Sequence, residues 1–445
     1  MRIFPLPTIE IPWISPDSAL STMSTHRWAA YLDSGGAETN GRARWSFLCL
    51  SPTETLEYHA GDLRRNGASA HGNVWDHLRN MTSTGSASRL AEGNPVPFTG
   101  GIVGMIAYEA GLNLENVSSR HSSLTPTFIA ASFNDVLAFD RHEKRCWWSS
   151  QAGHPAPDLS QARLSCKTPS IRFRPEQSRE TWTDAVRKVI AFIKAGDIFQ
   201  ANLTMRWFAE RTDDFDELAA YQALRDTSPA PFGAYLKTPA FSLLSASVER
   251  FLSLSTKGLI ETRPIKGTIS LGMTAAETTH NMRLLASDEK ELAENLMITD
   301  LMRNDIGRVS RIGSVCVPQL SQVEQFPHVL HLVSAIQGQL RPELEAVDLL
   351  KATLPPGSVT GAPKKRAMEI IDLLETSPRG AYCGSLFRIG HDGGMDSSVI
   401  IRSMSRVDNL LAIGSGGGIT VLSDPLREYE EMLLKVAPIL KAFEE

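Results

Sequence analysis

The sequence predicts an α+β protein whose sheets are antiparallel. The stretch from Phe241 to Thr268 has a strand pattern with a turn at Lys257-Gly258, whereas apolar residues recur at helical spacing from about Asp288 to Met302 and from about Pro425 to Phe443. Strands and helices do not alternate regularly along the chain. This arrangement favours antiparallel sheets over a parallel Rossmann-type sheet.

A change in composition divides the chain. Glycine, proline and serine crowd the stretch from Gln151 to Pro175, which predicts a loop between an N-terminal region, residues 1–165, and a catalytic region, residues 175–441. The first region is rich in short strand patterns. The second opens with a helix marked by Trp182, Val186 and Val189 and ended by Gly196.

Composition excludes several functional classes. The chain has 445 residues, is 42% hydrophobic and 21% charged, and carries a net charge of about -5, so nucleic acid or an anionic membrane is not its expected partner. The N-terminus has no signal-peptide pattern, and the longest apolar run falls far short of the roughly 20 residues of a membrane helix. Five scattered cysteines argue against a disulfide scaffold or a zinc site. We expect a cytoplasmic protein.

Two predicted helices each carry a pair of glutamates. Glu291 and Glu294 lie three residues apart on one helix, and Glu428 and Glu431 repeat this spacing on the last helix, with Lys435 one turn further. Carboxylate oxygens from two helices could hold Mg²⁺, which prefers hard ligands. For a single pair, a solvated helix face is the commoner explanation of such spacing.

The predicted hairpin brings a lysine to a carboxylate. With a two-residue turn at Lys257-Gly258, Glu249 would lie directly opposite Lys266 on the same face of the sheet. Such a pair could combine a nucleophile with a proton-transfer group. A cross-strand salt bridge on a solvated sheet fits the pattern alone better, and a bulge or a three-residue turn would shift the pairing.

Three further features could contact an anion or a substrate. The glycine-rich segment Gly414 to Thr420 lets backbone N–H groups approach a carboxylate, although a glycine-rich hairpin fits equally well. Arg402 could bind a carboxylate through its guanidinium group or be an ordinary strand-edge arginine. His331 lies in an apolar strand, where a core histidine is the default interpretation.

Taken together, these segments resemble the chorismate-utilising enzymes, a family that includes anthranilate, aminodeoxychorismate, isochorismate and salicylate synthases. The resemblance runs from about Gly196 to Val436 in the family's order, and YLDSGGAETNGRARWSFLCLSP extends it towards the N-terminus. The matching blocks are GDIFQANLT, SVERFLSL, TRPIKGT, DEKELAENLMITDLMRNDIGRV, HVLHLVSAI, PPGSVTGAPKKRAMEIIDLLE, RGAYCGSLF, DSSVIIRS, GGGIT and DPLREYEEMLLKV. The resemblance implies two antiparallel sheets packed face to face and flanked by helices.

Two positions distinguish branches of the family. TRPIKGT carries Lys266 where anthranilate synthases typically have alanine, which resembles the aminodeoxychorismate synthase branch, component I. There the lysine is understood to attack C2 of chorismate and expel the C4 hydroxyl, after which ammonia adds at C4. Gln200 stands where the water-adding members place a lysine. Both positions imply addition of ammonia for p-aminobenzoate and folate biosynthesis.

The resemblance also implies roles for particular residues. Glu294 and Glu431 would bind Mg²⁺ directly, Glu291 and Glu428 through water, and Glu249 would be the acid/base for the C4 hydroxyl. Substrate contacts would come from Arg402, Tyr382, Thr360, Lys435 and the backbone of Gly416 and Gly417, with His331 near the departing hydroxyl. Ammonia would come from a separate glutamine amidotransferase subunit, because the chain shows no GxCxG nucleophile motif.

Two alternatives stay open on the sequence. One is anthranilate synthase component I, which Lys266 disfavours. The other is a non-catalytic chorismate-binding regulatory protein, which is disfavoured because Glu249, Lys266 and the four glutamates are all present. LDSG, from Leu32 to Gly35, resembles a region that forms a tryptophan pocket in relatives, and the sequence does not decide whether this chain binds tryptophan.

Overall fold

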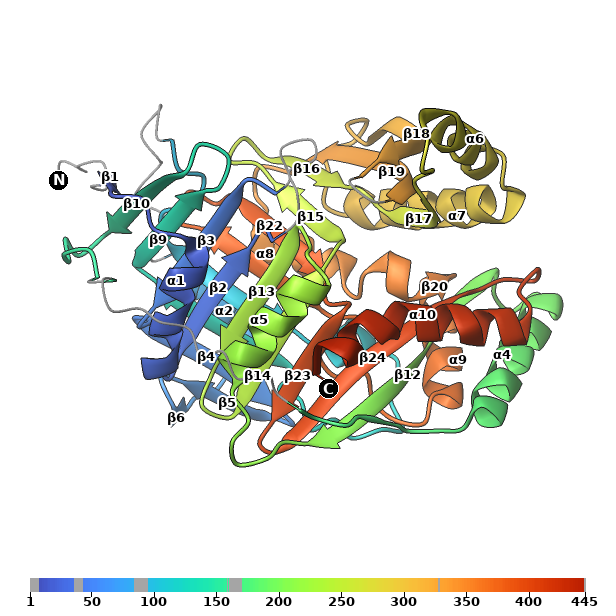
Figure 1. Ribbon diagram of the computed structural model, residues 1–445, viewed down its shortest axis with the longest axis horizontal. Helices are drawn as coiled ribbons and strands as arrows, with labels where there is room; N and C mark the ends of the chain where they lie inside the picture. The colour runs from blue at the N-terminus through green and yellow to red at the C-terminus, as the bar shows by residue number, and fades with distance from the viewer. Residues whose placement is uncertain are drawn as a thin grey trace.

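Two antiparallel β-sheets packed face to face form the centre of the molecule, with helices on their outer faces (Figure 1). The computed structural model describes residues 8–35, 43–83, 95–157, 159, 170–326 and 329–443. All recorded strand pairings are antiparallel, and the two sheets contain 12 strands each. The predicted α+β class with antiparallel sheets is therefore confirmed.

The first sheet begins with the N-terminal strand and ends beside the strand that opens the catalytic region. In spatial order its strands are β1 (Thr8–Ile11), β10 (Arg145–Ser150), β9 (Asp135–Asp140), β3 (Trp45–Leu50), β2 (Ala29–Asp33), β13 (Phe232–Lys237), β14 (Phe241–Ser247), β23 (Ser403–Val407), β24 (Leu410–Ile419), β12 (Gln200–Glu210) and β11 (Arg174–Pro175), with β20 (Gly361–Ala362) also paired to β12.

The second sheet, like the first, takes strands from both the N-terminal and the catalytic region. Its spatial order is β17 (Ile265–Ser270), β19 (Val329–Gln339), β16 (Leu259–Thr262), β15 (Arg250–Leu254), β22 (Met395–Val399), β21 (Ser385–Gly390), β7 (Gly101–Ile106), β8 (Phe128–Phe133), β4 (Glu54–His59), β5 (Asp62–Arg65) and β6 (Ala68–Ser69), with β18 (Cys316–Gln325) also paired to β19.

Helices cover the outer face of each sheet. On the first sheet α4 and α10 pack against β24 and against each other, and on the second α7 packs against β17, β18 and β19. The helices are α1 (Pro16–Leu20), α2 (Val74–Ser83), α3 (Tyr108–Leu114), α4 (Arg179–Lys194), α5 (Glu217–Thr227), α6 (Ala275–Ala286), α7 (Glu289–Gly307), α8 (Ala346–Thr353), α9 (Lys364–Leu374) and α10 (Pro425–Phe443), with short 3₁₀ turns η1 (Ser21–Thr25) and η2 (Gly357–Val359).

The two predicted regions, 1–165 and 175–441, do not form separate structural layers. Each sheet takes strands from both regions: β3 and β14 lie in the first sheet, and β7 pairs with β21 in the second. Apolar side chains from both regions, including Phe47, Val103, Ile129 and Leu243, form one buried cluster. Residues 158 and 160–169 of the predicted loop lie outside the described part.

The predicted helices form where local signals favour them. The Asp288 side chain caps α7 by accepting a hydrogen bond from the Glu291 backbone N–H at 3.0 Å. Asp424 accepts from the N–H groups of Leu426 and Arg427 at the start of α10, whose first residue is a proline. Gly196, with φ +82°, follows the C-cap of α4, as predicted.

The predicted direct pairing of Glu249 with Lys266 is wrong. Ser253 pairs with Glu261 and Leu254 with Ile260, one residue away from the register of a two-residue turn, because the turn has three residues and closes at Gly258 with φ +80°. Beyond Thr262 the chain follows β19, so Lys266 pairs with Leu332. The two side chains are nevertheless brought to one cavity by a different route.

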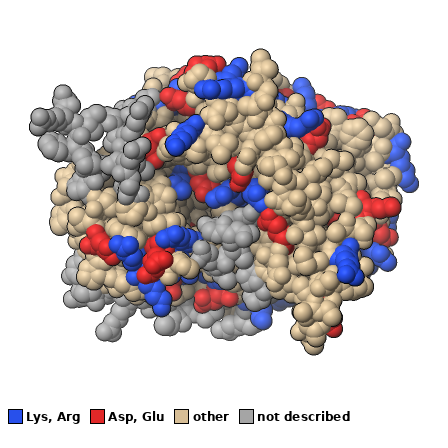
Figure 2. All heavy atoms as spheres, turned by 90° about the horizontal axis from the view of Figure 1, so that it is seen from above, with Lys and Arg blue, Asp and Glu red and all other residues tan. Residues whose placement is uncertain are grey.

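The molecular surface carries charged side chains of both signs (Figure 2). On the face shown in Figure 2, Lys and Arg side chains lie among Asp and Glu without an extended region of one sign. Within the described residues no helix is long and apolar enough to span a membrane. Cys49, Cys146, Cys316 and Cys383 are free thiols, and Cys166 lies outside the described residues.

Candidate active site

A cavity of about 580 Å³ lies between the two glutamate-bearing helices and the strands beneath them. Its size is typical of pockets for small organic ligands. The predicted site residues that line it are Glu249, Lys266, Glu291, Glu294, His331, Tyr382, Arg402, Gly416, Gly417, Glu431 and Lys435. Residues that are far apart in the sequence, and of the chemical types selected from it, therefore meet around one space.

Two chain crossings between the sheets supply Glu249 and Arg402. Glu249 lies where the chain leaves β14 for β15, and Arg402 where it leaves β22 for β23. Backbone hydrogen bonds join the crossings: Val399 N–H donates to the Glu249 carbonyl at 3.1 Å, and Ala246 N–H donates to the Arg402 carbonyl at 3.0 Å. Residues 153 positions apart are thus held side by side.

Arg402 has a mostly buried guanidinium group without an anionic partner. Among the described residues no hydrogen bond or ion pair to its side chain is present, and burial alone lowers its pKa. Its backbone has φ +50°, a left-handed conformation that is costly for a non-glycine residue. A buried, uncompensated cation aimed at a cavity is suited to bind a ligand carboxylate.

Glu249 and Lys266 face the same cavity in different surroundings. Glu249 is 8% exposed, and burial raises its pKa, an effect partly offset by a hydrogen bond from Ser358 and by the charge of Lys266. The Lys266 ammonium lies 3.8 Å from Glu294 Oε2 and 3.4 Å from the Ser358 carbonyl. A carboxyl with a raised pKa can donate a proton near neutral pH.

His331 is a neutral group in this site. It is 8% exposed, and burial lowers its pKa to about 4. Its Nδ1 lies 2.8 Å from the Thr268 hydroxyl, and its ring packs edge-on against Phe326. It is therefore a core-packed histidine that also lines the cavity, and at neutral pH it can offer a hydrogen bond but no positive charge.

In each glutamate pair one side chain is buried. Glu294 on α7 and Glu428 on α10 are each 5% exposed, and Lys290 lies between them, 3.0 Å from Glu428 Oε1 and 4.0 Å from Glu294 Oε1. Burial raises the pKa of Glu294. Burial and the neighbouring Glu294 raise that of Glu291 to about 7. Carboxylates that face one another with raised pKa values form a site suited to a cation.

The remaining glutamate faces solvent. The Glu431 side chain is 52% exposed, and Lys435 lies 2.8 Å from its Oε1. Burial would raise the pKa of Glu431, but Lys435 holds it below its ordinary value. Lys435 also donates to the Gly416 carbonyl at 3.3 Å, which links α10 to the glycine-rich strand.

The donor set fits a weakly coordinated Mg²⁺ ion better than a fully enclosed one. Among the described residues no three His, Cys, Asp or Glu side chains converge closely enough to hold a metal ion. Mg²⁺ commonly takes only one or two carboxylates and completes its octahedron with waters and substrate oxygens. Glu294 and Glu431, together with Glu291 and Glu428, carry carboxylate oxygens of the kind that such an ion would take.

The glycine-rich strand presents backbone to the cavity. Strand β23 stops pairing with β24 at Met404 and Ile413, whereas β12 stays paired with β24 as far as Ile419. Gly414 to Gly418 therefore have one edge without a strand partner, and all five line the cavity. A Cβ on Gly418 would lie 3.0 Å from Glu294 Oε2, so a side chain at this position would crowd that carboxylate.

Two predicted residues lie behind the cavity wall. Gln200 is 1% exposed at the start of β12, and its Oε1 has no partner among the described residues. Thr360 is fully buried, and its hydroxyl donates to the carbonyls of Pro356 and Gly357. Neither side chain lines the cavity. Glu428 does not line it either, but its carboxylate accepts a hydrogen bond from Lys290, which does.

Several residues that line the cavity were not predicted from the sequence. Lys290 lies directly beside Glu291 in the sequence, and its i, i+4 spacing to Glu294 was a usable signal. Asn202 and Ser358 also line the cavity. Their positions depend on the pairing of β12 with η2 and β20, for which the sequence holds no local signal.

A buried ion-pair network holds the floor of the site. The Arg379 guanidinium donates to the carbonyls of Val359 and Asn202, both at 2.6 Å, and to the Glu375 carboxylate at 2.7 and 3.0 Å. Burial would raise the pKa of Glu375, but Arg379 and Arg206 hold it below its ordinary value. The network fixes two cavity-lining segments relative to each other.

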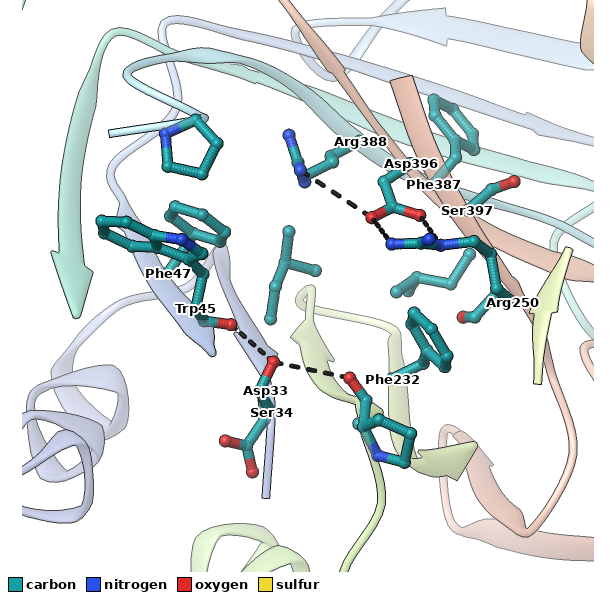
Figure 3. A pocket seen from close by; sticks show the side chains of 16 residues that line it. Asp33, Ser34, Trp45, Phe47, Phe232, Arg250, Phe387, Arg388, Asp396 and Ser397 are labelled. Atoms are coloured by element: carbon teal, nitrogen blue, oxygen red, sulfur yellow. Dashed lines mark hydrogen bonds and ion pairs between the residues drawn. The ribbon is translucent and has the colours of Figure 1, made fainter. Parts of the chain in front are cut away.

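A smaller cavity of about 270 Å³ is lined in part by the LDSG segment (Figure 3). Leu32, Asp33 and Ser34 of this segment line it. The two cavities share no lining residue. Arg250, the neighbour of Glu249 in the chain, makes paired hydrogen bonds to Asp396 in its wall at 3.0 and 3.1 Å. Ser34 donates to the Trp45 carbonyl at 2.6 Å.

Comparisons with known proteins agree with this architecture. Residues 29–441 match the family described as chorismate binding enzyme. The chain is 38% identical to aminodeoxychorismate synthase component 1 of Escherichia coli (strain K12), over 95% of each chain, and 35% identical to anthranilate synthase component 1 of Methanothermobacter thermautotrophicus, over 91% of this chain and 87% of that one.

A solved structure shows the same fold. The crystal structure of anthranilate synthase component I from Streptococcus pneumoniae TIGR4 superposes with a TM-score of 0.77 at 30% identity, over 91% of this chain and 93% of that one. The family match covers every strand of the two sheets except β1, and all the residues around the larger cavity. This chain therefore belongs to the chorismate-binding enzyme family.

Proposed function

We propose that this chain aminates chorismate at C4 to give 4-amino-4-deoxychorismate, the precursor of p-aminobenzoate for folate biosynthesis in the cytoplasm. The observation that carries the proposal is Lys266. It is 13% exposed, faces the cavity together with Glu249, and lies 3.8 Å from Glu294. Relatives named aminodeoxychorismate synthase component 1 support the same activity.

In the first step Lys266 releases its ammonium proton to solvent and attacks C2 of chorismate as the free amine. A bond forms between Nζ and C2, the ring double bonds shift, and the C4–O bond breaks. Glu249, whose pKa is raised by burial, gives its proton to the departing oxygen, which leaves as water. Its carboxylate then accepts the extra proton from the lysine nitrogen, so the covalent adduct is a neutral secondary amine.

In the second step ammonia attacks C4 of the adduct. The ring double bonds shift back and the bond between C2 and Nζ breaks. The leaving lysine nitrogen takes one proton, which balances the proton lost by the new C4 amine. The net reaction converts chorismate and ammonia into aminodeoxychorismate and water, and Lys266 is regenerated.

The remaining residues bind and orient the substrate. Arg402, which has no anionic partner among the described residues, binds one substrate carboxylate. The unpaired backbone edge at Gly416 and Gly417 binds the other, beside Tyr382 and Lys435. Neutral His331 offers a hydrogen bond near the C4 hydroxyl. Gln200 and Thr360 support the wall from behind. When bound at the glutamates, Mg²⁺ would neutralise a substrate carboxylate.

Ammonia is supplied by a glutamine amidotransferase subunit in this proposal. Relatives named component 1 support the existence of a second component. The isolated chain should accordingly use ammonium salts and not glutamine. Its rate should increase with pH as NH₃ replaces NH₄⁺.

One assay tests the activity. The purified chain is incubated with chorismate, ammonium and Mg²⁺, and half of the sample is then treated with aminodeoxychorismate lyase. p-Aminobenzoate should appear only in the treated half. Fluorescent anthranilate formed without lyase would assign the chain to anthranilate synthesis instead.

A second measurement tests the nucleophile. Intact mass spectrometry after addition of chorismate without ammonia should show an adduct that maps to Lys266 and is absent from Lys266→Ala. Lys257→Ala, which removes an exposed lysine from the β15–β16 turn, is the matched control and should form the adduct normally. An adduct on another lysine would contradict the assignment.

A further inference from the structure

Lys290 bridges the two helices that carry the glutamates. Its ammonium lies 3.0 Å from Glu428 Oε1 on α10 and 4.0 Å from Glu294 Oε1 on its own helix α7. Both carboxylates are buried, and Lys290 is the only ion-pair partner of Glu428 among the described residues. The contact therefore differs from an exposed ion pair, whose effect on stability is usually small.

The position of Lys290 in its helix needs an explanation. It is the second residue of α7, where the helix macrodipole disfavours a positive charge. The favourable partners are the carboxylates of the cluster, which repel one another when no cation separates them. Three lysines contact three glutamates of the cluster: Lys266 lies near Glu294, Lys435 contacts Glu431 and Lys290 contacts Glu428.

Lys290 differs from the other two lysines in what it contacts. Lys266 also contacts the Ser358 carbonyl, and Lys435 also donates to the Gly416 carbonyl. Lys290 contacts carboxylates only and is 28% exposed, so its flexible side chain can move towards solvent. Among the described residues, its movement out of the cluster would break only its contacts with these carboxylates.

We propose that Lys290 is a resident counter-ion of the glutamate cluster, which bridges Glu294 and Glu428 in the metal-free protein and is displaced when Mg²⁺ binds. This inference rests on the magnesium site of the proposed function. The ammonium group and Mg²⁺ are attracted to the same carboxylates, so binding of the ion must overcome the contacts that Lys290 makes. The lysine thereby weakens Mg²⁺ binding and keeps α7 and α10 together in its absence.

The test measures metal binding directly and needs no turnover. Isothermal titration of MgCl₂ into the purified, substrate-free chain should show that Lys290→Met binds Mg²⁺ about tenfold more tightly than wild type. Without Mg²⁺ the variant should melt at a lower temperature than wild type, and saturating Mg²⁺ should remove most of this difference. Lys290→Arg, which keeps the charge, should bind Mg²⁺ almost as wild type does.

Arg303→Gln is the matched control, because Arg303 forms an exposed ion pair with Asp300 on the same helix. It should leave Mg²⁺ binding unchanged. Equal or weaker Mg²⁺ binding by a folded Lys290→Met would overturn the counter-ion role and leave the metal site intact. If wild type itself does not bind Mg²⁺, the metal site of the proposed function fails and this inference fails with it. Lys290→Gln provides a second neutral variant if Lys290→Met does not fold.

Discussion

Arg402 is predicted to reduce the stability of the empty protein while it binds substrate. Its guanidinium group is mostly buried without an anion, and its backbone has φ +50°. Arg402→Met keeps much of the side-chain volume and removes the charge. The backbone strain stays, so any change in stability reports the side chain alone.

The expected magnitudes follow from the environment of the side chain. Replacing buried ionic groups by apolar ones of similar volume has stabilised proteins by about 1–4 kcal/mol, and an unpaired cation should lie within that range. A chain of this length should then gain a few °C in melting temperature. Truncating one partner of a buried, hydrogen-bonded charge pair costs about 2–5 kcal/mol, so kcat/KM for chorismate should fall between roughly 30-fold and several thousand-fold.

Two assays on the same preparations separate these effects. Differential scanning fluorimetry without ligand should show Arg402→Met melting above wild type, and titration with chorismate should stabilise wild type only. Arg388→Met is a comparison variant, because the Arg388 side chain is 17% exposed but lies 3.9 Å from Asp396 in the smaller cavity. It should destabilise the protein. The reasoning is refuted if Arg402→Met melts below wild type and is still protected by chorismate.

Three further predictions concern groups around the site. Glu375→Gln leaves Arg379 and Arg206 without their shared carboxylate and should lower the free energy of unfolding by about 3–5 kcal/mol in urea titrations, whereas a change below 1 kcal/mol would show that the network is dispensable. For His331, burial lowers the folded-state pKa from 6.5 to about 4, so the folded protein binds fewer protons than the unfolded chain between these values. Wild type should therefore lose up to about 3 kcal/mol of stability as the pH falls from 6.5 to 4, a loss that His331→Gln avoids and that parallel denaturation curves at both pH values would reveal. Gly418→Ala places a Cβ 3.0 Å from Glu294 Oε2 and should weaken Mg²⁺ binding, measured by calorimetry. Gly307→Ala, at the end of α7, is the control and should leave Mg²⁺ binding unchanged, because its Cβ meets nothing within 4 Å.

Local signals were sufficient to predict the helices. The helix predicted from Pro425 to Phe443 is α10, because the proline, the Asp424 cap and the apolar periodicity all act within a few residues. The helix from about Asp288 to Met302 was predicted five residues short of its end at Gly307. Arg303, Asn304 and Asp305 interrupt the apolar pattern after Met302, so the buried Ile306 was not recognised as part of the helix.

Strand partners were not predictable from local pattern. A turn of three residues in place of two changed the pairing of β15 with β16, and Pro264 interrupts the strand before Lys266 joins β19. Neither detail alters the hydrophobic pattern. Likewise, nothing around residue 165 showed that both sides of the predicted loop would share each sheet, since that depends on contacts between distant strands.

Most of the candidate residues line one cavity although the strand pairing was not predicted, because they come from separate elements. Glu249 reaches the cavity from a crossing between sheets, Lys266 from an edge strand, and Glu294 and Glu431 from two helices that are far apart in the sequence. Each supplies one charge to a shared space, and the balance among these charges determines what the space can bind.

Arg402 needs an anion and the buried glutamates need a cation, and Lys290 supplies part of the required positive charge from within the chain itself. A dianionic substrate that arrives with Mg²⁺ would satisfy both requirements, so substrate and metal should bind with positive coupling. Calorimetry of chorismate binding with and without Mg²⁺ measures that coupling, and equal affinities would show that the two requirements are met independently.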